Sequence, residues 1–274
     1  MNMNCILITE ENREDFASVF PMSIELTDKR VAIAACDDDG LVLGAVSYKV
    51  LNFQYEIDWI YVEEEVRRQG VGTWLIEQIL RAVMQTGELL PVTARFEFSE
   101  EDNEMHSFFL SNEYMDVEYS HEKYYLTAKE IKRIANIMPL SNPSIKVENF
   151  FDKQPRQQFR ALDLFRMDQT YSIDDYDSWK AECIPELCKC VYFHDDLADL
   201  MFVKELSDGV LELTYLYGKE PKGLASLLYE VLSEKERLYP DAAVTFEAVS
   251  PDAEQLAEHM FPGASTVHVY EAEF

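Results

Sequence analysis

The sequence predicts an α/β protein of two tandem domains, each a twisted, mostly antiparallel mixed sheet flanked by helices. Strand-like and helix-like segments alternate along the chain, and the same order of elements occurs in both halves. Gly223 lies 153 residues after Gly70, and Thr245 lies 152 residues after Thr93. Because prolines interrupt the chain at 139 and 143, we expect domains at 1–138 and 139–274.

In the first half, strand-like segments at 31–35 and 41–48 flank an Asp-Gly hairpin signal, and a third covers 55–62. A loop then leads into a helix at 74–85, where Leu75, Ile79 and Val83, and likewise Ile76, Leu80 and Met84, recur four residues apart. Gly87 is placed to end this helix. A strand at 92–98, a helix that opens with a capping box at 99–102, and a strand at 114–126 complete the predicted order.

The second half repeats this order. Predicted strands at 200–206 and 210–217 flank a hairpin signal at 207–209, and a loop at 218–225 precedes a helix at 226–235. A strand at 244–249 is followed by Ser250 and Pro251, which suit the N-cap and first position of a helix. A last strand is expected at 266–274.

The loop at 66–73, Val-Arg-Arg-Gln-Gly-Val-Gly-Thr, is the strongest functional signal in the sequence. A glycine loop that opens a helix leaves backbone N–H groups unpaired at the positive end of the helix dipole, which suits a phosphate. The loop lacks the Gly-Lys-Ser/Thr ending of a Walker loop and the three glycines of a dinucleotide fingerprint. The ordinary alternative is a surface turn that contains two glycines and two arginines.

This strand, Arg-x-x-Gly-x-Gly loop and helix resemble the acetyl-CoA site of the GCN5-related N-acetyltransferase (GNAT) family. The resemblance implies an N-acetyltransferase whose pantetheine pairs with the strand before the loop, and in which the N–H of Val62 polarises the thioester carbonyl. It implies these residues for binding acetyl-CoA: Ile60, Tyr61, Val62, Arg67, Arg68, Gln69, Gly70, Val71, Gly72 and Thr73.

Direct acetyl transfer requires a group that removes a proton from the acceptor amine. Glu56 and Asp58 lie two residues apart on the same strand and share one face, so one of them is the candidate base; an ordinary solvated acidic pair is the alternative. The resemblance also implies a tyrosine acid for the thiolate, but its position aligns with Phe109, which cannot donate a proton. Tyr114 or His106 could replace it, and we take Tyr114 as the candidate.

The second loop differs in its chemistry. Gly223 and Ala225 keep the Gly-x-Ala ending, but Glu220 stands in the place of the arginine, and Pro221 removes a backbone donor. We therefore expect the cofactor to bind the first domain and the second to be a degenerate copy.

Composition limits the partners. A net charge of −28 argues against nucleic acid and anionic membranes and suits a cationic small or peptidyl amine, although a solvated acidic surface would have the same composition. There is no long apolar run and no secretory signal pattern, so a cytoplasmic location is expected. Cys183, Cys188, Cys190 and His194 form at best a partial zinc set, and we expect buried thiols and no metal.

Two other functions stay open. The missing tyrosine and the decayed second loop are compatible with a non-catalytic acyl-CoA-binding module. An acidic interaction protein that binds a basic partner is the third possibility, and the presence of Arg67, Gly70 and Gly72 together argues against it. The acceptor amine and the oligomeric state do not follow from the sequence.

Overall fold

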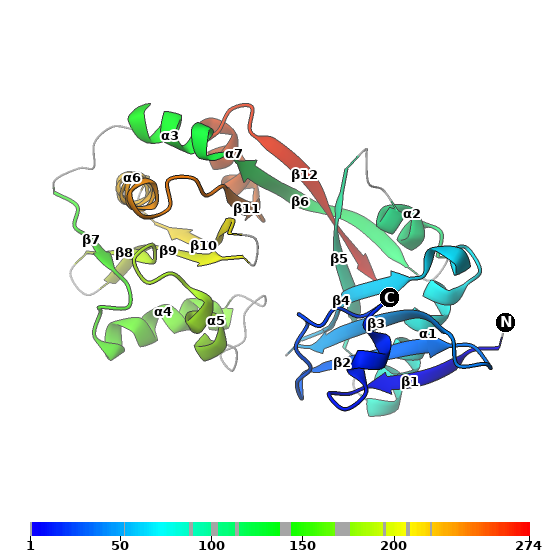
Figure 1. Cartoon of the computed structure of the whole chain (residues 1–274). Coiled ribbons are helices and arrows are strands. Elements are labelled where there is room, and N and C mark those ends of the chain that lie inside the picture. The colour runs from blue at the N-terminus through cyan, green and yellow to red at the C-terminus, as the bar shows by residue number, and fades with distance from the viewer. Residues whose placement is uncertain are drawn as a thin grey trace. The chain divides into compact units, whose positions relative to one another are not determined.

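The structure of the chain is a computed structural model that describes residues 2–51, 53–87, 90–99, 104–112, 115–137, 144–167, 176–193, 196–206, 209–219 and 221–274. Contacts within it define two compact units (Figure 1). Unit 1 comprises Met1–Ser120 and Val269–Phe274, and unit 2 comprises His121–His268. These units differ from the predicted division at residue 138, because strands β6 (Asp116–Leu126) and β12 (Ser265–Glu273) contribute residues to both.

Unit 1 contains a mixed sheet with helices packed on it. Its first strands follow the order β1-β2-β3-β4-β5-β12, in which β4 and β5 are parallel and the pairs from β1 to β4 are antiparallel. Its elements are β1 (Asn4–Ile8), η1 (Arg13–Phe16), β2 (Arg30–Cys36), β3 (Val42–Val50), β4 (Tyr55–Val62), η2 (Glu64–Val66), α1 (Val71–Thr86), β5 (Val92–Phe98) and α2 (Glu104–Leu110), with the unit 1 parts of β6 and β12.

Helix α1 forms where the apolar spacing predicts it. Leu75, Ile76, Ile79 and Val83 are buried against the sheet, and the N–H of Gly87 closes the helix on the carbonyl of Met84. The helix begins three residues earlier than predicted, directly after the loop. Met84 was expected on the apolar face, but the residue is 78% exposed. The predicted capping box at 99–102 falls largely outside the described residues.

Unit 2 repeats the order seen in β3, β4, α1 and β5. Strands β9 and β10 form an antiparallel hairpin, α6 follows, and β11 pairs with β10 in parallel. Unit 2 is built from α3 (Ala128–Ile137), β7 (Val147–Asn149), α4 (Pro155–Met167), α5 (Tyr176–Glu182), β8 (Lys189–Phe193), β9 (Asp196–Glu205), β10 (Leu211–Gly218), α6 (Pro221–Leu238), β11 (Val244–Ala248) and α7 (Pro251–Met260). Ser250 caps α7 through a hydrogen bond from the N–H of Ala253, as predicted.

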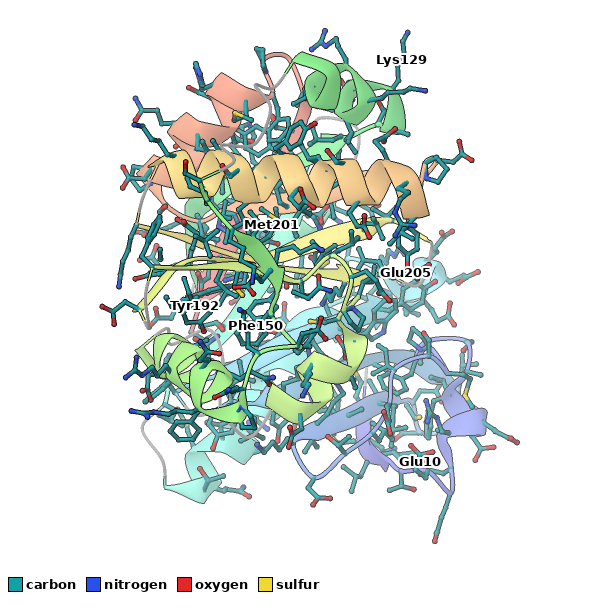
Figure 2. All side chains as sticks on the ribbon, turned by 90° about the vertical axis from the view of Figure 1, so that its left-hand side faces the viewer. Glu10, Lys129, Phe150, Tyr192, Met201 and Glu205 are labelled. Atoms are coloured by element: carbon teal, nitrogen blue, oxygen red, sulfur yellow. The ribbon has the colours of Figure 1, made fainter. Side chains whose placement is uncertain are left out.

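The sheet of unit 2 separates two apolar layers, which Figure 2 shows around Met201 and Phe150. Met201 packs in one cluster with Leu227, Leu228 and Val231 of α6. Phe150 packs in the other with Ala161 of α4 and Phe202. Met201 and Phe202 are neighbours on β9 and face opposite sides, so this strand, which is buried on both faces, is an almost continuous apolar run. No helix in the described part of the chain is both long and apolar enough to cross a membrane.

Candidate functional site

The glycine loop of unit 1 presents the start of α1 without a side-chain cap. Gly70 occupies the N-cap position in the left-handed conformation, with φ 85°, and no side chain accepts from the first turn. Within the described residues, the structure shows no protein acceptor for the backbone N–H groups of Val71, Gly72 and Thr73. These donors, together with the helix dipole, form a place for an anion.

Strand β4 parts from β5 just before this loop. The parallel pairing covers only Tyr55 to Ile57 on β4, so the rest of the strand has an open edge toward β5. The N–H of Glu63 donates to the carbonyl of Leu43, which makes Val62 and Gly44 a non-hydrogen-bonded pair. The N–H and C=O of Val62 therefore point away from β3, toward the open edge. The C=O accepts a hydrogen bond from Nε of Arg67 at 3.0 Å, and the N–H could pair with an extended ligand.

A pocket of about 500 Å³ lies where the open edge, the loop and helix α2 meet. It is lined by the end of β4, the loop, the first turn of α1 and one side of α2: Ile60, Tyr61, Val62, Val66, Arg67, Arg68, Gly70, Val71, Gly72, Thr73, Glu104, Met105, Phe108 and Ser111. Of the ten residues predicted to bind the cofactor, all except Gln69 are in this lining. Gln69 donates from its side chain to the carbonyl of Glu65. The binding roles themselves stay predictions.

The contribution of α2 to the pocket was missed in the sequence. Met105 and Phe108 are three residues apart and lie on one side of the helix, a spacing that could have indicated a shared face. Phe108 also closes over Gly72, where an added Cβ would come within 2.8 Å of the ring. Gly72 is therefore required for helix packing as well as for access to the loop.

The two candidate carboxylates lie next to the pocket residues on β4 but are not in the pocket lining. Asp58 is held by Arg30, with 2.8 Å between Oδ2 and Nε, and accepts a 2.6 Å hydrogen bond from Ser47. Glu56 has a longer contact, 3.9 Å to the Nζ of Lys49, which also lies 3.7 Å from Asp58. Because Lys49 reaches both, the two carboxylates share one face, and Glu56 is the less engaged of the two.

The candidate acids are less well supported by their surroundings. Phe109, at the position of the family tyrosine, is fully buried and stacks on Phe96. His106 packs against the rings of Phe98 and Tyr270, each at 4.7 Å between centroids, and is not in the pocket lining. Tyr114 lies outside the described residues.

The thiols of unit 2 are packed in an apolar cluster. Cys183, Cys188 and Cys190 are buried with Phe150 and Leu200, and burial raises the pKa of Cys190 to about 12. Burial likewise raises the pKa of Cys188, so both are held as neutral thiols at neutral pH. His194 lies outside the described residues, and within them no group of His, Cys, Asp and Glu side chains is arranged to hold a metal ion.

We therefore expect these thiols to be unreactive in the native protein. Of the five cysteines, Cys5 is exposed and the other four are buried, so a thiol reagent at pH 7.5 should modify one residue quickly and the rest only after unfolding. Mass spectrometry of the labelled protein identifies the modified residue. Rapid labelling of Cys188 or Cys190 in native protein would contradict the apolar packing. Labelling that becomes rapid only after a zinc chelator is added would also contradict it.

In unit 2, a side chain from β9 occupies the place that corresponds to the loop site of unit 1. Asp199 of β9 is paired with Gly218 of β10. Asp199 therefore has the position in unit 2 that Gly44, which is paired with Val62, has in unit 1. Its carboxylate is fully buried and lies against Gly223 in the first turn of α6, where an added Cβ would overlap Oδ2. A carboxyl side chain thus already occupies the start of this helix, where the pocket of unit 1 is open. Glu220 lies outside the described residues.

Residues 5–111 match the model of the acetyltransferase (GNAT) family. The fold is similar to that of a tandem GNAT protein from the clavulanic acid biosynthesis pathway, with 13% identity, a TM-score of 0.66, and coverage of 99% of this chain and 98% of that one. It is also similar to a GCN5-related N-acetyltransferase from Sphaerobacter thermophilus, with 16% identity, a TM-score of 0.59, and coverage of 96% and 84%. No curated protein matches the chain.

At these identities the solved structures show the fold alone, and it is the predicted one: two α/β units with mixed sheets in tandem. The family match covers the part of the chain that forms the pocket, from β1 to the end of α2. Residues 5–111 therefore form a domain of the acetyltransferase (GNAT) family, within a chain that has the fold of a tandem GNAT protein.

Proposed function

We propose that this protein is an acetyl-CoA-dependent N-acetyltransferase whose cofactor binds in the pocket of unit 1. The observation that carries the proposal is the meeting of two sets of open hydrogen-bond donors at one pocket: the outward N–H of Val62 and the uncapped first turn of α1. The first suits an extended amide chain such as pantetheine, and the second suits a pyrophosphate.

The residues present fit this cofactor. A Cβ added at Gly70 would meet no atom within 4 Å, so there is free space in front of the loop. Val71, Gly72 and Thr73 offer N–H donors, Arg68 adds positive charge, and apolar Ile60, Val62, Met105 and Phe108 suit an aliphatic chain. Bound acetyl-CoA would supply an activated thioester.

The chemistry asked of the chain is limited to positioning, polarisation and proton transfer. The N–H of Val62 would polarise the thioester carbonyl of a bound acetyl-CoA, in a reaction in which the acceptor nitrogen would bond to the carbonyl carbon and the carbon–sulfur bond would break. Glu56 or Asp58 would take the proton from the amine, directly or through water. The acceptor would be a small or peptidyl amine, and its positive charge suits a chain with a net charge of −28.

A calorimetric titration tests the proposal. Both CoA and acetyl-CoA should bind with one site per chain, because Asp199 fills the corresponding place in unit 2. A thiol-release assay over polyamines, aminoglycosides, amino acids and peptides should then find an accepted amine. No binding of CoA would overturn the proposal. Tight binding of acetyl-CoA without transfer to any amine would instead establish the non-catalytic acyl-CoA-binding module, which the buried Phe109 favours.

The two carboxylates should behave differently when replaced. We expect Glu56→Gln to lower kcat by roughly 10² with CoA affinity unchanged, because its carboxylate is the less engaged of the two. Asp58→Asn should mainly lower stability, by about 1–3 kcal/mol, because it weakens a part-buried pair with Arg30. Steady-state kinetics and thermal melting separate the two effects, and Glu77→Gln on the surface of α1 is the control. Small and equal kinetic effects at both positions would assign proton removal to water.

A further inference from the structure

Arg67 and Arg68 are neighbours in the loop, and their surroundings differ. Arg67 donates from Nε to the carbonyl of Val62 at 3.0 Å and from Nη1 to Glu104 at 3.0 Å. Its guanidinium also lies 5.6 Å from the ring centroid of Tyr61. All three partners line the pocket, so Arg67 connects the end of β4 to the start of α2.

The bond to Val62 is the important part of this connection. The carbonyl that accepts it belongs to the peptide group at the open edge, next to the N–H that would polarise a thioester. Holding this carbonyl fixes the direction of the last peptide groups of β4. The contact with Glu104 contributes little to stability, because the Glu104 side chain is 69% exposed, but its charge offsets that of Arg67.

Arg68 has the opposite character. It is the only residue other than glycine with a positive φ, 62°, in the described part of the chain. This left-handed conformation is unfavourable for an arginine and is typical of functional sites. The structure shows no ion pair or hydrogen bond of its guanidinium with any described residue, although Arg68 lines the pocket.

We infer that Arg67 is a positioning residue for the open edge of β4, whereas Arg68 supplies the positive charge for an anionic ligand. Because the charge of Glu104 offsets that of Arg67, Arg68 provides the remaining positive charge of the pocket lining. The acidic run Glu63, Glu64 and Glu65 lies beside it in the sequence. The assignment of the ligand as CoA rests on the proposed function. The assignment of Arg67 to positioning stands on the ligand-free contacts.

Lysine substitutions distinguish the two roles, because lysine keeps the charge but has one nitrogen and cannot replace the Nε–Nη fork. Calorimetry with CoA at several salt concentrations should show that Arg67→Lys weakens binding by roughly tenfold with an unchanged salt dependence. Arg67→Gln should weaken binding at least as much, because it also leaves the charge of Glu104 without its partner. Arg68→Lys should bind nearly as the native protein does. Arg68→Gln should bind roughly tenfold more weakly, with a flatter salt dependence. Arg81→Gln, which removes the Arg81–Glu77 surface pair on α1, is the matched control.

A measurement without ligand separates this inference from the proposed function. Hydrogen exchange should be faster at 58–63 in both Arg67 variants and unchanged in both Arg68 variants. Native affinity in Arg67→Lys together with weak binding in Arg67→Gln would make Arg67 the ligand's charge partner and overturn the inference. Unchanged exchange at 58–63 in the Arg67 variants would also overturn it. If the native protein does not bind CoA, the proposed function fails, and the exchange data still decide the role of Arg67.

Discussion

Replacing Gly70 by glutamate should abolish measurable CoA binding while leaving the protein folded. The new side chain would begin in the open space in front of the loop and bring a carboxylate to the N–H groups of Val71, Gly72 and Thr73. It would both occupy the anion site and repel a pyrophosphate, so a loss of more than about 3 kcal/mol in binding free energy, over a hundredfold in Kd, is expected. Calorimetry measures the affinity, and thermal melting checks the fold.

Gly87 provides a matched control, because it ends the same helix in the same left-handed conformation, with φ 76° and open space around its Cβ position. Gly87→Glu should carry a similar backbone cost, about 1–2 kcal/mol, and bind CoA normally. The CoA affinity of Gly70→Gln should lie between that of the native protein and that of Gly70→Glu, because glutamine fills the space without adding a charge. A folded Gly70→Glu protein with native affinity would place the cofactor elsewhere.

The loop and α1 were predictable because their signals are local. Glycines that adopt positive φ and an apolar spacing of three and four residues determine backbone conformation within one or two turns. The open edge of β4 followed from the family resemblance, and the contacts of Arg67 with Val62 and Glu104 did not, since they depend on where α2 packs. A short helix with few periodic positions gives too little pattern to predict that packing.

The division into units could not be read from local patterns either. The end of β12 belongs to unit 1, where the N–H of Phe274 bonds to the carbonyl of Val92. Periodicity identifies 266–274 as a strand but does not say which strand it pairs with, because that choice depends on which sheet edge is free after folding. Prolines do interrupt the sequence at 138–143. The units nevertheless do not divide there, because β6, which precedes this segment, and β12, which follows it, each contribute residues to both units.

In unit 2, Gly223→Ala should cause a large loss of stability, because the new methyl group would overlap the buried carboxylate of Asp199. The carboxyl group is fully buried against the start of α6, so it must shift to make room for the methyl group. Overpacking together with a disturbed buried polar group predicts a loss of about 2–4 kcal/mol. Hydrogen exchange of α6, residues Pro221–Leu238, locates the loss in unit 2, and the CoA affinity of unit 1 should stay unchanged.

A double-mutant cycle tests whether Asp199 is the cause. Asp199→Ala removes the overlapping atoms, so Gly223→Ala should cost much less in that background, with a coupling energy above about 1 kcal/mol. Gly218→Ala is the graded comparison: its Cβ would lie 3.2 Å from the methyl carbons of Leu224 and 3.3 Å from Asp199 Oδ1, tight contacts without overlap, so a smaller loss is expected. If Gly223→Ala were tolerated, or if its cost were the same with Asp199 removed, the carboxylate would not fill the start of α6.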